Sequence, residues 1–301
     1  MTYANPGALF LRKFGPVCHV VDVMRYVAFL RDEAGLGIEP PIDLSLVYRR
    51  FEIPVPALVP LPNQQGLLVN SERGVILINE GDLATRRRFT EAHEVIELLF
   101  SAQPSGIGWA ARRAGAFKMG TKEQLCNEGA AELLMPRESF VPRLKRMGIS
   151  FQAAWFLSEE YRVSATAALV HMVRLGKGHH AVVVWRMKNK PIEIGNKAPK
   201  EQLSLFNEMP KPNPPMKLRV EWSFGGPTVP FIPQDKSVPE ESSIHSAWRD
   251  GSFTIGEDVL HLGTTKGKFK SESQPFESND ERLVISLLHF PSDEEECRKL
   301  R

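Results

Sequence analysis

The sequence predicts an α+β fold in two parts: a mainly helical first half that contains a small β-hairpin, and a strand-rich second half. Two observations lead to this prediction. Up to residue 175 apolar residues recur mostly at helical spacing, whereas from residue 179 onward short apolar runs alternate with turn-forming residues. We therefore expect three segments: an N-terminal helical extension over residues 1–39, a domain over 40–177 and a strand-rich domain over 178–301.

The first half begins with helices around one hairpin. Residues 20–34 have the apolar spacing of a helix, which Gly35 ends. That helix is too short to be a complete helix-turn-helix domain, so we interpret it as a packing extension. Asp43 is expected to cap the next helix, which runs to Phe51. Residues 66–69 and 75–79 then predict a hairpin, and a long helix follows over about 83–101.

Capping residues mark two further helices. Thr121 and Gln124 have the spacing of a capping box, which opens a helix that Pro136 ends. Ser164 is expected to cap the last helix of the first half, and Gly176 to end it. In the second half we expect strands over residues 181–187, 218–224, 252–255 and 283–288, a proline-rich loop over 207–215 and a charged, frayed helix over 292–301.

Composition narrows the class of protein. The chain has 301 residues, with 38 basic and 36 acidic side chains and a net charge of +2, so nothing in it demands direct binding to nucleic acid or to a membrane surface. No apolar run approaches the roughly 18 residues of a membrane span, and the first fifteen residues lack signal-peptide features. The three cysteines are odd in number and widely spaced, so we expect a cytoplasmic protein.

The long helix carries the most informative pattern, His-Glu-x-x-Glu at residues 93–97. His93 and Glu97 are one helical turn apart on the same face, so both can bind one ion. Glu94 lies obliquely beside them, where it could take a proton from a water molecule that the metal activates. The alternative is a solvated pair of charges. The surrounding apolar residues favour burial of this helix on several sides, which would make unpartnered charges costly.

Glu123 is a candidate third ligand. It lies in the first turn of the helix that Thr121 caps, thirty residues after His93, which leaves enough chain for a return beside the first helix. A metal site held in fixed geometry takes ligands from more than one element.

These segments resemble the ImmA/IrrE family of bacterial metallopeptidases. That family usually reads R-R-F-T-x-A-H-E-x-x-H and then E-x-x-A-N-x-F-A-A-x-L-L-M-P. The chain has R-R-F-T-E-A-H-E at residues 87–94 and E-x-x-C-N-x-G-A-A-E-L-L-M-P at 123–136. The likeness extends over residues 40–176, and it implies a zincin-like, mainly helical peptidase domain.

Position by position, the resemblance implies that His93 and Glu123 are metal ligands and that Glu94 is the general base. Glu97 occupies the place of the second histidine. It could be a working ligand to Zn²⁺, a ligand that shifts the preference toward Mn²⁺ or Fe²⁺, or the mark of an inactivated relative. Cys126 and Gly129 also depart from the family pattern. Cys126 is expected to be a small buried filler, with a thiolate that reaches the metal as the alternative.

By resemblance we expect a metal-dependent endopeptidase that cleaves a helix-turn-helix repressor and so switches on a stress, mobile-element or defence response. The strand-rich domain would then sense an unknown trigger or bind the partner, and some relatives carry a GAF-type domain at this place. The alternative is a catalytically inactive relative that binds a regulator without cleaving it. A DNA-binding regulator is disfavoured by the balanced charge.

Several other residues are weaker candidates. His171 could reach the site, although a buried structural histidine is the simpler interpretation. The adjacent residues His179 and His180 could bind a metal as a pair. Because neighbours on a strand point to opposite faces, we interpret them instead as a pair in a turn. Arg86, Arg87 and Arg88 could pair with the site carboxylates or form a solvated face.

Overall fold

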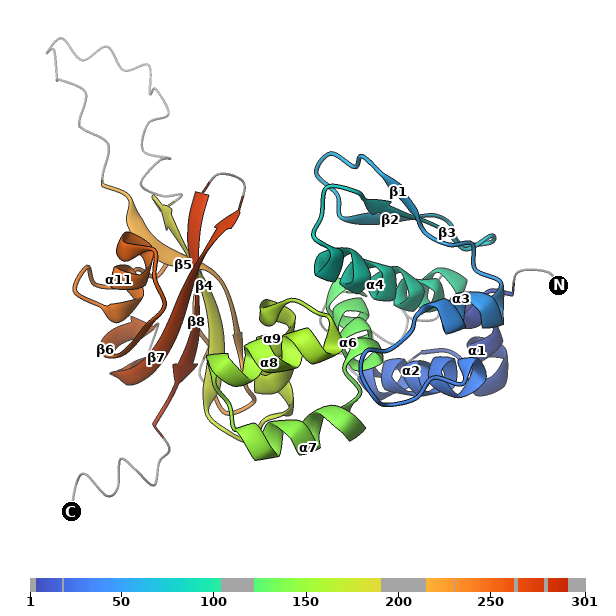
Figure 1. Ribbon diagram of the computed structural model, residues 1–301, viewed down its shortest axis with the longest axis horizontal. Helices are drawn as coiled ribbons and strands as arrows, with labels where there is room; N and C mark the ends of the chain where they lie inside the picture. The colour runs from blue at the N-terminus through green and yellow to red at the C-terminus, as the bar shows by residue number, and fades with distance from the viewer. Residues whose placement is uncertain are drawn as a thin grey trace, which may run out of the picture. The chain divides into compact units, whose positions relative to one another are not determined.

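In the computed structural model, residues 4–17, 19–103, 122–190, 215–229, 231–262, 265–278 and 281–291 are described (Figure 1). The chain divides into two compact units, Met1–Gly148 with Gln152–Ala168, and Ile149–Phe151 with Leu169–Arg301. The expected α+β class, helical first and strand-rich second, is confirmed. The segment boundaries at residues 39 and 177 stay predictions. Thr121, Cys18, Cys297, most of the proline-rich stretch and all of the charged tail lie outside the described residues.

The first unit opens with three helices, α1 (Pro6–Phe14), α2 (Val20–Ala34) and α3 (Ser45–Phe51). Helix α2 has the predicted bounds, and Gly35 ends it in the left-handed conformation at φ +64°. Asp43 accepts a hydrogen bond from the backbone N–H of Ser45 at 3.0 Å, but the N-cap of α3 is Leu44, one residue after the predicted cap. Helix α1 was not predicted. It begins at Pro6, and the Asn5 side chain caps it.

A three-stranded sheet follows, made of β1 (Ala57–Val59), β2 (Gly66–Asn70) and β3 (Val75–Asn79) in the order β1-β3-β2. Strands β2 and β3 are the predicted hairpin, and β1 adds to β3 in parallel. Strand β2 is therefore an edge of this sheet, which leaves one side of its backbone available to another extended chain.

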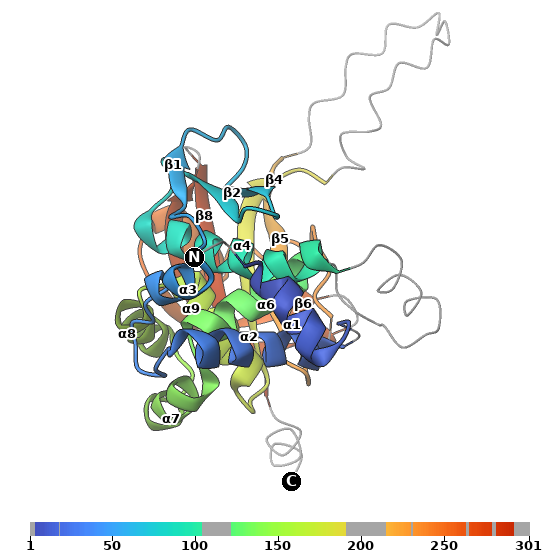
Figure 2. The ribbon, with the colours of Figure 1, turned by 90° about the vertical axis from the view of Figure 1, so that its right-hand side faces the viewer.

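Helix α4 (Ala84–Ala102) lies between this sheet and the helices α1 and α6 (Lys122–Leu134), as the two views of the first unit show (Figures 1 and 2). Ala92, Val95, Ile96, Leu98 and Leu99 are fully buried. The expected burial of this helix on several sides is confirmed, and its polar stripe faces the space beneath β2.

Helices α7 (Arg137–Met147), α8 (Phe151–Tyr161) and α9 (Ala165–Leu175) complete the helical half. Pro136 separates α6 from α7 as predicted, and the Ser164 hydroxyl caps α9 by accepting from the N–H of Ala167 at 3.1 Å.

The second unit is built on an antiparallel five-stranded sheet in the order β5-β4-β8-β7-β6. Its strands are β4 (His180–Lys188), β5 (Lys217–Gly225), β6 (Thr254–Leu262), β7 (Thr265–Ser278) and β8 (Glu281–His289), and one helix, α11 (Ser243–Asp250), packs on it. Trp185, Val220, Val284, Ile244 and Ala247 lie in the core between sheet and helix. Strand β7 and helix α11 were not predicted.

None of the helices in the described part of the chain is both long and apolar enough to cross a membrane. The proposed likeness of the second unit to a GAF-type domain stays a prediction.

Candidate metal centre

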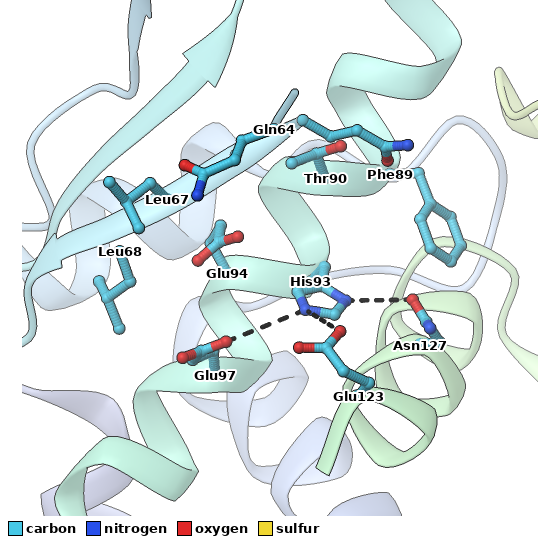
Figure 3. Close-up of a pocket in the computed structure, with 12 residues that line it drawn as sticks. Gln64, Leu67, Leu68, Phe89, Thr90, His93, Glu94, Glu97, Glu123 and Asn127 are labelled. Carbon is cyan, nitrogen blue, oxygen red and sulfur yellow. Dashed lines mark hydrogen bonds and ion pairs between the residues drawn. The ribbon is translucent and has the colours of Figure 1, made fainter. Parts of the chain in front are cut away.

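Helix α4 brings three predicted residues to one cavity. His93, Glu94 and Glu97 line a space of about 500 Å³ that is also bordered by Glu123 of α6 and by β2 (Figure 3). The Nε2 atom of His93 lies 3.9 Å from Glu97 Oε2 and 3.4 Å from Glu123 Oε2. The three residues expected to hold a metal therefore converge on one nitrogen atom.

Asn127 orients His93. Its Oδ1 lies 3.1 Å from Nδ1 of the imidazole, on the side opposite the two carboxylates (Figure 3). When Nδ1–H donates to this oxygen, the lone pair of Nε2 points toward Glu97 and Glu123, which is the tautomer that binds a metal. Asn127 follows Glu123 by four residues, so one face of α6 carries both. That spacing is the signal from which its role could have been predicted.

Glu97 is paired with a lysine. Lys122 Nζ lies 2.5 Å from Glu97 Oε1, and this lysine, like Glu123, belongs to the first turn of α6. Two of the three arginines that were considered for this pairing have other partners: Arg86 pairs with Asp82 at 3.5 Å, and Arg88 donates to the carbonyl of Ile42. The pairing of Lys122 with Glu97 was not predicted from the sequence.

Glu94 lies deeper than the other carboxylates. It is 6 % exposed, and its carboxylate lies on the side of β2, where the backbone N–H of Leu68 donates to it (Figure 3). Burial, followed by the charges of Glu97 and Glu123, raises the pKa of Glu94 to about 7. A carboxyl group with a pKa near neutrality can both accept and return a proton, as a general base and acid must.

Cys126 is both buried, as predicted, and close to the candidate ligands. Its side chain is fully buried, and a ligand atom of each of Cys126, His93 and Glu97 lies within 4.8 Å of the others. Burial, together with the nearby charge of Glu97, raises the pKa of its thiol well above the usual range.

Gly66 closes the cavity on the side of the sheet. A Cβ atom at this position would lie 2.3 Å from Cγ2 of Thr90 and 3.2 Å from Oε1 of Glu94. Only a residue without a side chain lets β2 lie this close to the polar stripe of α4. From the sequence, Gly66 was expected only to begin a strand, and this requirement was not predicted.

The other histidines considered earlier lie elsewhere. His171 is 1 % exposed and belongs to the second unit, as do His179 and His180. None of the three lines the cavity. His180 begins strand β4 instead of lying in a turn, and its ring packs edge-on against that of His289.

The donor set fits a divalent metal. Zinc ligands lie about 2.0–2.3 Å from the ion, so donor atoms in a tetrahedral site are roughly 3.3–3.8 Å apart. The 3.4 Å between His93 and Glu123 is already in this range, and the atoms of His93, Glu97 and Cys126 are within 4.8 Å of one another. Small side-chain rotations would bring either set around one ion.

Comparison with known proteins agrees with this geometry. The peptidase family described as the IrrE N-terminal-like domain matches residues 51–172. The chain is also similar to the radiation response metalloprotease IrrE of Deinococcus deserti, with 37 % identity over 99 residues. This match covers 33 % of the chain and 35 % of the relative, so the chain spans about a third of that protein's length.

A solved structure resembles the fold of the chain. A Mycobacterium tuberculosis transcriptional regulator superimposes with a TM-score of 0.56, covering 95 % of this chain and 80 % of the regulator at 10 % sequence identity. At so low an identity the likeness concerns the fold alone.

Proposed function

Through its IrrE N-terminal-like domain, residues 51–172, the chain belongs to the ImmA/IrrE family, and on this premise we propose that it is a metal-dependent endopeptidase. One observation carries the proposal. Glu94 is buried, lines the same cavity as His93, Glu97 and Glu123, and has a pKa raised to about 7.

His93, Glu97 and Glu123 would hold the metal, which we expect to be zinc, with manganese or ferrous iron as the alternatives for a carboxylate-rich site. A divalent metal bound there supplies Lewis acidity and lowers the pKa of a water molecule. Glu94 accepts the proton of the attacking water and returns it to the nitrogen atom that leaves. Asn127 keeps the imidazole of His93 in the tautomer that the site requires.

Strand β2 would bind the substrate. It is the edge of its sheet, it borders the cavity, and its Leu67 and Val69 side chains are 41 % and 54 % exposed. An extended peptide can pair its backbone with such an edge and place alternate side chains against these apolar groups. The arrangement supports a protein segment in extended conformation as substrate.

The identity of the substrate follows from the family resemblance. We expect a helix-turn-helix repressor, cleaved in the cytoplasm to switch on a stress, mobile-element or defence response. The second unit would sense the trigger or bind the partner. Direct binding of nucleic acid or of a membrane is not part of this proposal.

A second function is favoured by one observation. Lys122 already neutralises Glu97 at 2.5 Å, as expected if the position no longer serves a metal. The chain would then be an inactive relative that binds a regulator without cleaving it.

Two cleavage assays test the proposal, each with added zinc, manganese or ferrous iron. One uses a quenched fluorescent peptide library, and the other uses a helix-turn-helix repressor. Glu94→Gln should abolish cleavage and keep the metal. Glu91→Gln is the matched control, because Glu91 lies on the same helix and bonds Tyr48, outside the cavity. Cleavage that survives Glu94→Gln would overturn the assigned base. A metal-loaded parent that binds the repressor but cleaves nothing would establish the second function.

A further inference from the structure

Cys126 lies where a ligand would lie. Its buried Sγ is grouped with a nitrogen of His93 and an oxygen of Glu97, all within 4.8 Å of one another. Building on the metal site of the proposed function, we propose that Cys126 is a metal ligand in this chain, so that a thiolate supplies the soft donor that the missing second histidine does not.

The packing of α6 against α4 explains how the thiol reaches this place. Cys126 is three residues before Gly129, so both lie on the same face of α6. A Cβ atom on Gly129 would lie 3.0 Å from Cγ2 of Ile96 and 3.1 Å from Cγ1 of Val23. The absence of a side chain there lets α6 approach α4 closely, and this approach brings Sγ within 4.8 Å of a nitrogen of His93. The two departures from the family pattern, Cys126 and Gly129, thus act together.

The thiol is better fixed than the carboxylate of Glu123. Cys126 is fully buried, whereas the side chain of Glu123 is 67 % exposed. A short, packed side chain loses little conformational freedom when it binds an ion, whereas a long exposed one loses more. His93 and Cys126 would therefore be the rigid part of the site, and the two carboxylates would be the adjustable part.

The donor chemistry changes the expected metal. A set of one imidazole and two carboxylates suits manganese or ferrous iron about as well as zinc, but a thiolate shifts the preference toward zinc. Binding replaces the S–H bond by a metal–sulfur bond and releases the thiol proton to solvent, so metal uptake should release a proton that Cys126→Ala does not release. Lys122, 2.5 Å from Glu97, offsets part of the added negative charge.

Cobalt substitution tests the assignment without relying on activity. In a full-length Cys18→Ser/Cys297→Ser background Cys126 is the only thiol. Loading with Co²⁺ should give thiolate-to-cobalt charge transfer in the near ultraviolet, and zinc-edge X-ray absorption should show a sulfur shell at about 2.3 Å. Cys126→Ala, with a circular dichroism spectrum like that of the parent, should lose both signals and weaken zinc binding at least about tenfold, because losing a ligand should cost at least as much as losing the hydrogen-bond partner of a ligand.

The outcomes separate this inference from the proposed function. Cobalt ligand-field bands without charge transfer, or an unchanged zinc affinity in Cys126→Ala, would overturn the thiolate ligand and leave the peptidase in place. Charge transfer that persists in Glu94→Gln without cleavage supports both proposals. A protein that takes up neither cobalt nor zinc would overturn both, and a protein with the sulfur shell that cleaves nothing would overturn the peptidase alone.

Discussion

Lys122 Nζ lies 2.5 Å from Glu97 Oε1, so a cation at the start of α6 holds the carboxylate that stands where relatives have a histidine. Glu97 also lies 3.9 Å from Nε2 of His93. Lys122 would therefore compete with a metal ion for the carboxylate of Glu97. The side chain of Lys122 is 44 % exposed, which makes it a weak competitor in solution.

Lys122→Gln should tighten metal binding by up to about fivefold, because an exposed ion pair is worth about 0.2–1 kcal/mol and 1.4 kcal/mol corresponds to a factor of ten. Competition with a chromogenic chelator at low salt measures the change. Lys145→Gln, an exposed position on α7 outside the cavity, is the control. Weaker binding in Lys122→Gln would mean that the lysine supports the site and does not compete for it.

Asn127→Ala should weaken metal binding about 10- to 100-fold, the range found when a partner of a ligating histidine is removed. The physical reason is the 3.1 Å contact with His93 Nδ1, which selects the tautomer and orients the ring. Asn127→Asp keeps an acceptor at that place and should retain binding. Gln124→Ala is the control, because the Gln124 amide on the same helix donates to Glu128 at 3.1 Å, and it should leave the affinity unchanged. Equal losses in the alanine and aspartate variants would contradict this account.

Gly66→Ala should destabilise the first unit by about 1–3 kcal/mol, the usual cost of overpacking. The added Cβ would meet Cγ2 of Thr90 at 2.3 Å. Thr90→Ser removes that methyl group and keeps the hydroxyl that donates to Arg86, so the double variant should recover most of the stability. Urea unfolding measures both, with Gly81→Ala as the control. A double variant as unstable as Gly66→Ala would show that the clash is not with Thr90.

Much of the helical half could be predicted from the sequence because its capping and stop residues are local signals. Gly35, Pro136 and Ser164 each act within one turn of their own helix, and the structure places each boundary where these residues indicate. The convergence of His93, Glu97 and Glu123 was predictable from helical spacing and family resemblance. The pairing of Lys122 with Glu97 depends on the approach of two helices, which no local pattern records.

Strand β7 shows why the second half was harder to predict. Ser271 and Ser273 on one face of this strand are fully buried, and Glu272 on the opposite face is 5 % exposed. These side chains are satisfied by partners far away in the sequence: Ser273 bonds Ser286 at 2.7 Å, and Glu272 accepts from the N–H of Phe151 at 2.8 Å. A buried polar strand has no apolar periodicity, so its tertiary hydrogen bonds, and not its pattern, decide its structure.

Glu94 predicts how the stability of the metal-free protein depends on pH. Its pKa rises from 4.5 in the unfolded chain to about 7 in the fold, mainly through burial. Between these values the folded state binds more protons, so stability should fall as pH rises, by on the order of 2–3 kcal/mol for this group. Glu94→Gln should lose this slope and be more stable than the parent at high pH. Urea unfolding of metal-stripped protein measures it, and parallel pH profiles would contradict the prediction.

His180 should have the opposite effect in the second unit. Burial, with smaller contributions from the charges of His289 and His179, lowers its pKa from 6.5 to about 4, although Glu272 acts against this shift. Between these values the unfolded chain binds more protons, so stability is present above pH 6.5 and is lost as pH falls toward 4.

The loss in the free energy of unfolding should be on the order of 2 kcal/mol. It should be smaller than the pKa shift alone would give, because His180 is only half-buried and solvent screens its charge. Hydrogen exchange of peptides from β4 and β8 follows it locally. His180→Phe keeps a ring against His289, whose ring centroid lies 4.9 Å away, and should flatten the profile, whereas His261→Gln at an exposed site should not. Protection that falls equally in parent and His180→Phe would assign the acid sensitivity to the pair of His289 and Glu272, which are 3.0 Å apart.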